Sequence, residues 1–162
     1  MAEKVNFKTN ALRIIEGLKI HYTLHKYDHD EGFVCGVAIA DKLHQNQAQV
    51  FKTIVTVGAS KANYVFVLPV EKEIDFKAAA RTVGEKSVEM IKLTDLTKIT
   101  GYIRGGCSPI GMKRKFVTVI DVSCENFETI MVSAGKVGYQ MELAPSDLIR
   151  AAEASVADIC HS

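Results

Sequence analysis

An eleven-residue segment, residues 101–111, has the composition best suited to bind a ligand through the backbone. It reads GYIRGGCSPIG and holds four glycines and one proline. Glycine loses more conformational freedom on ordering than other residues and buries no side chain, so such a segment is hard to explain as core. A shaped loop lets a ligand approach main-chain N–H groups. The alternative is a plain connection with a tight turn at Ser108-Pro109. We favour a site, because function concentrates on loops held by a rigid scaffold.

A lysine in the middle of a predicted strand is a second candidate for chemistry. Residues 50–58 read VFKTIVTVG, and strand alternation places Lys52 on the same face as Val50 and Ile54. Both faces are largely apolar, which predicts a central strand. Burying an ammonium costs free energy unless an anion pairs with it, so Lys52 is a candidate site residue. The alternative is a lysine whose stem packs while its charged end reaches solvent at an edge of the sheet.

One cysteine, Cys107, lies inside the glycine loop and has two interpretations. It could be a nucleophile if a histidine activated it, but no histidine stands where the sequence alone would pair the two. We therefore expect Cys107 to line a pocket. The sequence also lacks a serine-hydrolase elbow, a Walker loop, a His-Glu-x-x-His helix and a Rossmann fingerprint.

The remaining candidates are backbone and charged groups rather than a triad of side chains. They are the glycine loop, Lys52 and a second glycine turn, Val-Ser-Ala-Gly, at residues 132–135. Main-chain N–H groups and a nearby cation stabilise the oxyanion that develops in acyl transfer. The pattern therefore favours electrostatic stabilisation of an oxyanion over catalysis by a Ser-His-Asp triad.

Neither a metal nor a cofactor is expected from the sequence. His21, His25 and His29 are spaced as in a strand, where residues four apart are separated by about 13 Å. One metal bound at about 2 Å from each ligand cannot bridge that separation. The cysteines form no Cys-x-x-Cys pair, so no structural zinc site or disulfide framework is predicted, and reduced thiols are expected at Cys35, Cys107, Cys124 and Cys160.

Length, apolar content and charge restrict the function classes. The 162 residues fit one domain, residues 1–162, and 48% of them are apolar, enough for a sizeable core. No apolar run is long enough to cross a membrane and the first residues show no signal-peptide pattern, so a cytoplasmic protein without a membrane partner is expected. A net charge of +1 argues against a protein that grips long DNA. The compact basic run, Lys113-Arg114-Lys115, directly follows the glycine loop.

Hydrophobic periodicity predicts helices and strands in an order that mixes helices with hairpins. Helices are expected at residues 10–17, 37–44, 75–83, from 94 or 95 to the glycine loop, and 145–154. Strands are expected at residues 21–27, 50–58, 64–70, 87–91, 116–122, 129–133 and 139–143. This order indicates a single α+β domain with a mixed, mostly antiparallel sheet flanked by helices.

Three motifs resemble those of the YbaK and prolyl-tRNA-synthetase-associated editing domain family. The resemblance covers nearly the whole chain, and the spacing of the glycine block is its most specific part. Within the family, the chain looks most like the stand-alone bacterial branch that acts on Cys-tRNA(Pro). The motifs are Val50-Phe51-Lys52-Thr53, Gly101-Tyr102-x-x-Gly105-Gly106-x-Ser108-Pro109-x-Gly111 and Val132-Ser133-Ala134-Gly135-Lys136, with His25-x-Tyr27-x-His29-Asp30 typical of that branch.

The resemblance implies a role for each matching residue. Lys52 matches the essential lysine, which would hold the terminal nucleotide of a tRNA through its phosphate or ribose. Gly106 matches the glycine whose N–H faces the ester carbonyl. Gln140 stands where close relatives carry an acidic residue, which puts the exact amino-acid specificity in doubt. The resemblance assigns substrate-binding positions to Tyr27, Phe33, Gly105, Cys107, Ser108, Ser133 and Gly135.

The activity that the resemblance implies is hydrolysis of wrongly charged aminoacyl-tRNA within a barrel-like YbaK fold. For a cysteinyl substrate, the thiol of the substrate would attack its own ester, so the protein needs no nucleophilic side chain. The expected partners are the acceptor end of tRNA(Pro) and prolyl-tRNA synthetase, with no cofactor. The alternatives are a deacylase for another amino acid such as alanine, a module that holds a tRNA end or a synthetase without catalysis, and a cysteine-dependent hydrolase resting on Cys107.

Overall fold

The computed structural model describes residues 8–27, 36–43 and 45–161 of the chain. Within these residues no helix is long and apolar enough to cross a membrane. The helices are α1 (Asn10–Gly17), α2 (Gly36–Lys42), α3 (Phe76–Val83), α4 (Leu96–Thr100) and α5 (Pro145–Ala152), with 3-10 turns η1 (Leu93–Asp95) and η2 (Val122–Asn126). The strands are β1 (Thr23–Lys26), β2 (Phe51–Gly58), β3 (Asn63–Pro69), β4 (Val88–Met90), β5 (Val117–Asp121), β6 (Ile130–Ser133), β7 (Tyr139–Leu143) and β8 (Ser155–Ala157).

The described strands form two sheets that meet at one backbone bridge. The smaller sheet has the order β1-β7-β6 and is antiparallel. The larger has the order β4-β2-β3-β5-β8, antiparallel from β4 to β3 and parallel from β3 to β8. Val50, just before β2, bridges to Met131 of β6 and so joins the two sheets. The predicted α+β class with a mixed, mostly antiparallel arrangement of strands is confirmed, and the described strands divide between one antiparallel and one mixed sheet.

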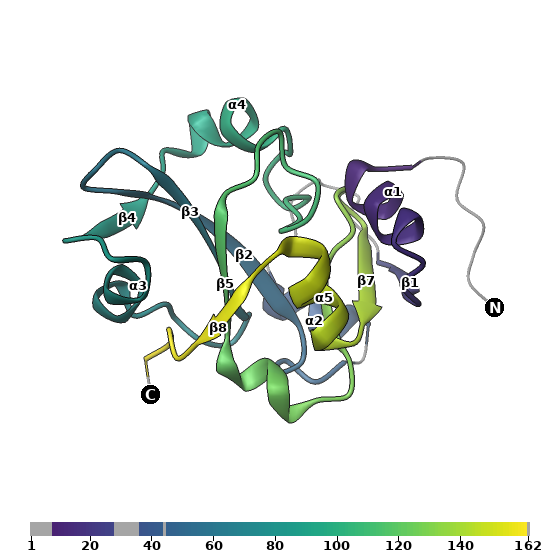
Figure 1. Cartoon of the computed structure of the whole chain (residues 1–162). Helices are drawn as coiled ribbons and strands as arrows, with labels where there is room; N and C mark the ends of the chain where they lie inside the picture. The colour runs from purple at the N-terminus through teal and green to yellow at the C-terminus, as the bar shows by residue number, and fades with distance from the viewer. Residues whose placement is uncertain (1–7, 28–35, 44, 162) are drawn as a thin grey trace.

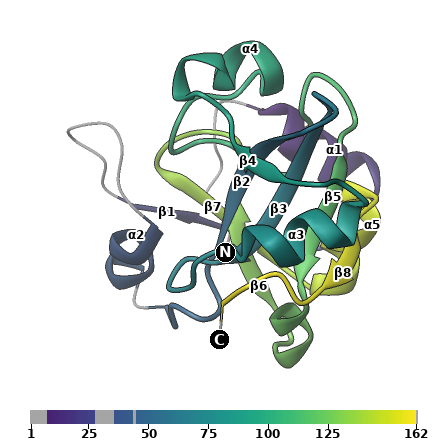
Figure 2. The same cartoon turned by 90° about the vertical axis from the view of Figure 1, so that its left-hand side faces the viewer.

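The hydrophobic core is divided by the larger sheet. On one face, Leu12 and Ile15 of α1 and Leu148 of α5 pack with residues of both sheets into the main cluster. On the other face, Ala79 and Ala80 of α3 cover Phe66 and neighbouring residues of the sheet. Figures 1 and 2 show α1 and α5 on one side of this sheet and α3 on the other. Because both faces of β2 and β3 are covered, their sequences are apolar on both faces.

Local capping signals place two helices where the sequence predicts them. The Thr9 side chain accepts a hydrogen bond from the N–H of Leu12 at the start of α1. Asp75 accepts from Lys77 and Ala78 at the start of α3, and Gly84 ends that helix in the left-handed region. Interactions between residues close together in the sequence therefore determine where α1 and α3 begin and where α3 ends.

The C-terminal strand β8 is not predicted from the sequence. The helix expected over residues 145–154 ends at Ala152, because Glu153 takes a left-handed conformation with φ +51°. The following residues pair in parallel with β5, Ser155 opposite Val119. A three-residue strand has too short a pattern to be recognised, and its pairing partner lies far away in the sequence.

The glycine loop is anchored between α1 and the sheets. Gly101 ends α4 with φ +86°, and the Tyr102 hydroxyl donates to the carbonyl of Ile110 at 2.6 Å. At Gly111, with φ +79°, a side chain would lie 2.9 Å from the backbone nitrogen of Ala11. The loop therefore packs backbone to backbone against the first turn of α1. This anchoring gives it a defined shape despite its glycine content.

Candidate active site

A cavity of ≈ 590 Å³ brings together residues that the sequence analysis selects from distant segments. Its walls come from α2, β2, the stretch from β4 to α4, the glycine loop and the β6–β7 hairpin. In Figure 2, α4 lies above β2 and α2 lies beside it. Four residues of the predicted site lie on these walls: Lys52, Gly105, Cys107 and Ser133.

Lys52 is a half-buried cation on the cavity wall. Burial lowers the pKa of Lys52, while the nearby Cys160 and Glu73 side chains act in the opposite direction. Among the residues that the structure describes, no ion pair involves Lys52. A partly desolvated ammonium without a fixed partner interacts favourably with an anion that enters the cavity. This is the property that a binding site for a phosphate or a developing oxyanion requires.

The glycine loop turns sharply where it lines the same cavity. The N–H of Gly106 donates to the carbonyl of Ile103 at 3.0 Å, and Gly105 has φ +84°. This is the geometry of a type II turn, which needs positive φ at its third residue. The family resemblance implies that the N–H of Gly106 faces an ester carbonyl, but in this structure that donor closes the turn. The N–H of Gly105 takes no part in the turn's hydrogen bond, and Gly105 lies on the cavity wall.

Gly106 instead allows two backbone segments to touch. A Cβ atom at Gly106 would lie 2.9 Å from the backbone nitrogen of Val137 and 3.2 Å from the Cα of Lys136. Both atoms belong to the turn between β6 and β7. The glycine loop and this turn are therefore in contact without an intervening side chain, which fixes the position of one relative to the other.

The β6–β7 turn holds its own shape through Ser133. The Ser133 hydroxyl accepts a hydrogen bond from the N–H of Gly135 at 3.1 Å, and Gly135 has φ +97°. Ser133 reaches the cavity, whereas Gly135 packs against Thr9 and Tyr102. Ser108 is buried, and its hydroxyl accepts from the N–H of Ile110 at 3.3 Å. Gly135 and Ser108 therefore shape the two turns, and neither is among the residues that line the cavity.

Gln140 presents a polar side chain to the cavity from β7. It is only 4% exposed and lies on the wall, and its Oε1 has no hydrogen-bond partner in the described part of the chain. Tyr27 is also buried and is tied to the hairpin turn through its N–H, which donates to Gly138 at 2.9 Å. Burial raises the pKa of the Tyr27 phenol, while hydrogen bonding to the phenol from the Gly138 backbone and the Gln140 side chain acts in the opposite direction. Phe33 lies outside the described residues.

Cys107 faces the cavity as a thiol rather than a thiolate. Burial raises the pKa of Cys107 to about 12, with Thr100 acting in the opposite direction through a hydrogen bond. A thiol with this pKa is essentially uncharged at neutral pH, and the thiolate is the nucleophilic form. The geometry thus agrees with a wall residue and disfavours the cysteine-dependent hydrolase.

One of the three histidines is engaged across the smaller sheet. The His25 Nε2 lies 2.8 Å from a carboxylate oxygen of Glu142 on the neighbouring strand β7. His21 is exposed, and His29 lies outside the described residues. Within residues 8–27, 36–43 and 45–161, no cluster of three His, Cys, Asp or Glu side chains could hold a metal ion.

The stretch from β4 to α4 supplies a wall that the sequence analysis did not assign to the site. Its cavity-lining residues are Met90, Ile91, Leu93 and Leu96, joined by Arg104 of the loop. A short strand followed by a short helix reads as ordinary core structure. The feature that marks this wall as part of a site is the exposure of Met90 and Leu93, which remain 52% and 55% exposed although they are large and apolar. That signal appears only in the folded structure.

The family of the chain follows from comparison with known proteins. Residues 35–151, which include β2, the glycine loop and the β6–β7 hairpin, match the aminoacyl-tRNA editing domain. The chain belongs to this family. A curated relative, the "Putative Cys-tRNA(Pro)/Cys-tRNA(Cys) deacylase EbsC" of Enterococcus faecalis, is 41% identical over 157 residues, which cover 97% of this chain and 96% of that protein. The editing-domain chain is therefore an aminoacyl-tRNA deacylase by family.

Solved structures agree with the fold of this editing domain. One, described as a putative trans-editing enzyme for prolyl tRNA synthetase, aligns with a TM-score of 0.80 and 20% identity, covering 97% of this chain and all of that one. A second, the hypothetical protein APE2540, aligns with a TM-score of 0.84 and 21% identity, covering 94% of this chain and all of that one. At these identities the likeness establishes the fold alone.

Proposed function

We propose that this editing domain hydrolyses the ester of Cys-tRNA(Pro) in the cytoplasm, acting in trans beside prolyl-tRNA synthetase. The observation that carries the proposal is the meeting of Lys52 with the glycine turn at one cavity, where the cysteine is an uncharged thiol. The 41% identity to the relative named for Cys-tRNA(Pro) and Cys-tRNA(Cys) supports the choice of cysteine.

Lys52 and the loop have complementary roles in the proposal. The Lys52 ammonium binds the phosphate or ribose of the terminal nucleotide, which brings the ester into the cavity. The ester carbonyl then lies against the turn at residues 103–106. The N–H groups of Gly105 and Cys107, both on the cavity wall, are the proposed donors to the developing oxyanion. Gly106 positions these donors by its contact with the β6–β7 turn.

The nucleophile in this proposal is the thiol of the substrate. Its sulfur attacks the carbonyl carbon of the same cysteine, and a C–S bond forms while the bond from carbon to the ribose oxygen breaks. The proton of the thiol ends on that ribose oxygen, which restores the tRNA hydroxyl. The cyclic thioester that results is then opened by water to give free cysteine. The protein contributes orientation and charge stabilisation only.

Selectivity for cysteine is tested with tRNA(Pro) charged in turn with cysteine, alanine and proline. We expect rapid release of cysteine and release of the other two near the rate of tRNA alone, because they carry no thiol. Preferential release of alanine would leave the proposed site unchanged but would make alanine the amino acid that is removed. Gln140 would then be the first residue to examine as the cause of that selectivity. Stable binding of all three charged tRNAs without release would identify a non-catalytic module instead.

Replacing Cys107 by serine separates the two roles considered for that residue. In a Cys107→Ser variant we expect kcat/KM for Cys-tRNA(Pro) to stay within about threefold of the wild type, since a wall residue changes by one atom. If kcat/KM fell a hundredfold or more while the midpoint of thermal unfolding stayed unchanged, Cys107 would be identified as the nucleophile. The wild type and Cys107→Ser are compared by release of labelled cysteine and by thermal unfolding.

A further inference from the structure

Positive and negative charges are segregated along the chain, although the chain as a whole is close to neutral. Residues 86–115, which run from β4 through α4 and the glycine loop, hold seven Lys and Arg residues against two Asp and Glu residues. Residues 116–162 hold two Lys and Arg residues against seven Asp and Glu residues. The first stretch therefore carries a net charge of +5 and the second a net charge of −5, and the two cancel in the net charge of +1 for the whole chain.

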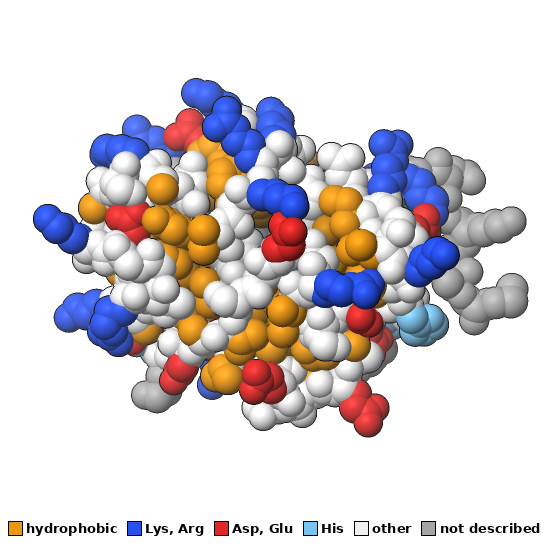
Figure 3. Space-filling model, in the orientation of Figure 1, with side chains coloured by type: hydrophobic (Ala, Val, Ile, Leu, Met, Phe, Trp, Pro, Cys, Tyr) orange, Lys and Arg blue, Asp and Glu red, His pale blue; other side chains and the backbone are white. Residues whose placement is uncertain are grey.

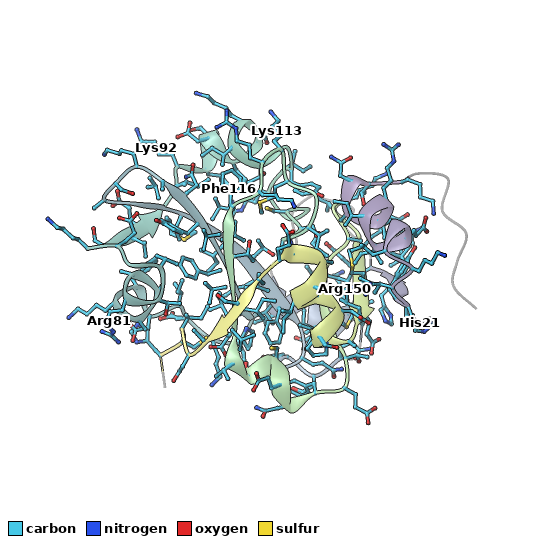
Figure 4. The ribbon with its side chains drawn as sticks, viewed as in Figure 1. His21, Arg81, Lys92, Lys113, Phe116 and Arg150 are labelled. Atoms are coloured by element: carbon cyan, nitrogen blue, oxygen red, sulfur yellow. The ribbon has the colours of Figure 1, made fainter. Side chains whose placement is uncertain are left out.

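The fold places the positive stretch along one edge of the molecule. Figure 3 shows Lys and Arg side chains gathered along the upper edge, where Figure 1 places α4, and Figure 4 labels Lys92 and Lys113 there. Asp and Glu side chains lie along the lower edge of the same view, near η2. A surface with one positive edge and one negative edge attracts a polyanion to the first and turns it away from the second.

Four cations of this positive edge, Lys92, Lys98, Lys113 and Arg114, form a basic ridge. All four side chains belong to exposed residues. In the part of the chain that the structure describes, none of the four forms an ion pair with a carboxylate. The neighbouring Lys115 differs, because it pairs with Glu153 at 2.7 Å. Like charges that gather without counter-ions repel one another, so a bound polyanion stabilises the ridge.

The basic ridge has a defined position because Lys113 is attached to the end of α4. The N–H of Lys113 donates to the carbonyl of Thr100 at 3.0 Å, and its Nζ donates to the carbonyl of Lys98 at 3.4 Å. A Cβ atom at Gly101 would lie 3.1 Å from the side chain of Lys113, so the lysine stem lies against that glycine. These contacts bring the cations of α4 and of residues 113–114 onto one surface.

The basic ridge begins beside the cavity. Leu93 and Arg104 both line the cavity, and Lys92 directly precedes Leu93. Arg104 stands three residues after Gly101, against which Lys113 packs, and three residues span at most about 11 Å. A nucleic-acid strand that leaves the cavity on this side therefore meets the ridge at once.

We propose that the basic ridge binds the backbone phosphates of the double-helical acceptor stem of the tRNA. A duplex carries closely spaced phosphates on both strands, which suits a group of cations that have no carboxylate partners. Contacts to phosphates fix the orientation of a duplex on a protein surface. This inference rests on the proposed function, because it concerns the same substrate. It adds that the surface of α4 and residues 113–114 orients the duplex outside the cavity.

Neutralising Lys113→Gln and Arg114→Gln in one variant tests the ridge. The probe is an RNA hairpin that copies the acceptor stem of tRNA(Pro) with its single-stranded end and carries no amino acid. We expect its Kd to rise about tenfold, and the slope of log Kd against log salt concentration to fall by about two, because two phosphate contacts are lost. The single-stranded end alone should bind the variant and the wild type equally.

Lys77→Gln combined with Arg81→Gln is the matched control. It also removes one lysine and one arginine, both exposed, from α3, and Figure 4 shows Arg81 far from Lys113. Affinity for the hairpin, its salt dependence and the midpoint of thermal unfolding should stay at wild-type values in this control. An equal loss of affinity in both variants would show a general effect of net charge and would overturn the proposal.

Three further results would contradict the ridge. They are wild-type affinity and salt slope in the ridge variant, absence of hairpin binding by the wild type at low salt, and equally tight binding of a polyglutamate peptide of the same charge. The proposed function is judged separately by release of cysteine from Cys-tRNA(Pro). If the wild type binds the hairpin as expected but releases no cysteine, the ridge is supported and the proposed function fails. If it releases cysteine while the ridge variant binds the hairpin normally, the ridge fails alone.

Discussion

Lys52→Met is expected to lower kcat/KM for Cys-tRNA(Pro) at least a hundredfold while making the folded chain slightly more stable. The ammonium is the half-buried cation on the cavity wall, and its loss removes the group that orients the terminal nucleotide. A methionine of similar length keeps the packing of the stem without the desolvated charge. We expect a gain of about 1 kcal/mol in the free energy of unfolding at neutral pH, or roughly 2–4 °C.

The pH dependence of this stability gain follows from the lowered pKa of Lys52. Between its folded pKa and the ordinary pKa of lysine, the unfolded chain binds more protons, so the stability of the wild type rises with pH in that window. The gain in the free energy of unfolding from Lys52→Met is therefore largest below the folded-state pKa of Lys52. It shrinks as the pH rises from that value to the ordinary pKa of lysine. Lys77→Met, at an exposed lysine of α3, should change neither activity nor this pH dependence. A Lys52→Met protein that retains activity would remove Lys52 from the mechanism.

Gly106→Ala is expected to damage both activity and stability. Its Cβ would lie 2.9 Å from the backbone nitrogen of Val137, and backbone atoms have little room to move. The glycine loop and the β6–β7 turn must then separate, which displaces Gly105 and Cys107 from the cavity wall. Overpacking of this kind costs about 1–3 kcal/mol of stability. A shift of the oxyanion donors by a few tenths of an ångström should lower kcat by at least about tenfold.

Gly17→Ala provides the matched control for this variant. A Cβ at Gly17 meets no atom within 4 Å, and the residue has no positive φ. The substitution at the end of α1 should be neutral or slightly stabilising, because alanine has the higher helix propensity. Thermal unfolding and kcat measured for both variants separate a local clash from a general effect of replacing glycine. Wild-type values in Gly106→Ala would contradict the backbone contact.

The parts of the fold and of the site that depend on local chemistry are predictable from the sequence. The caps at Thr9 and Asp75 follow from neighbouring residues, and Lys52 stands out as a charge in an apolar strand. Fold and family are also predictable, because the spacing of the glycine block is specific. Strand β8 is not, because three residues acquire their structure from pairing with β5.

The parts of the site that escaped prediction depend on tertiary geometry. In the pair Gly105-Gly106, only the dihedral angles reveal that Gly105 takes the positive φ and that the N–H of Gly106 closes the turn. Residues 51–55 of β2 line the cavity because β4 stops at Met90 and pairs only with residues 56–58, which no local pattern encodes. Much of the proposed chemistry depends on backbone N–H and C=O groups. Every residue type has these groups, so the amino-acid sequence does not directly show which of them face the cavity.

In the proposed reaction the substrate supplies the nucleophile and the protein orients it. Single-turnover release of cysteine from Cys-tRNA(Pro), measured beside release of serine from Ser-tRNA(Pro), tests this most directly. The two substrates differ by one atom, and a hydroxyl is a much weaker nucleophile than a thiol. We predict fast release of cysteine and release of serine at the rate of tRNA without protein. Equal acceleration of both would contradict attack by the substrate thiol, and acceleration of neither would contradict the deacylase itself.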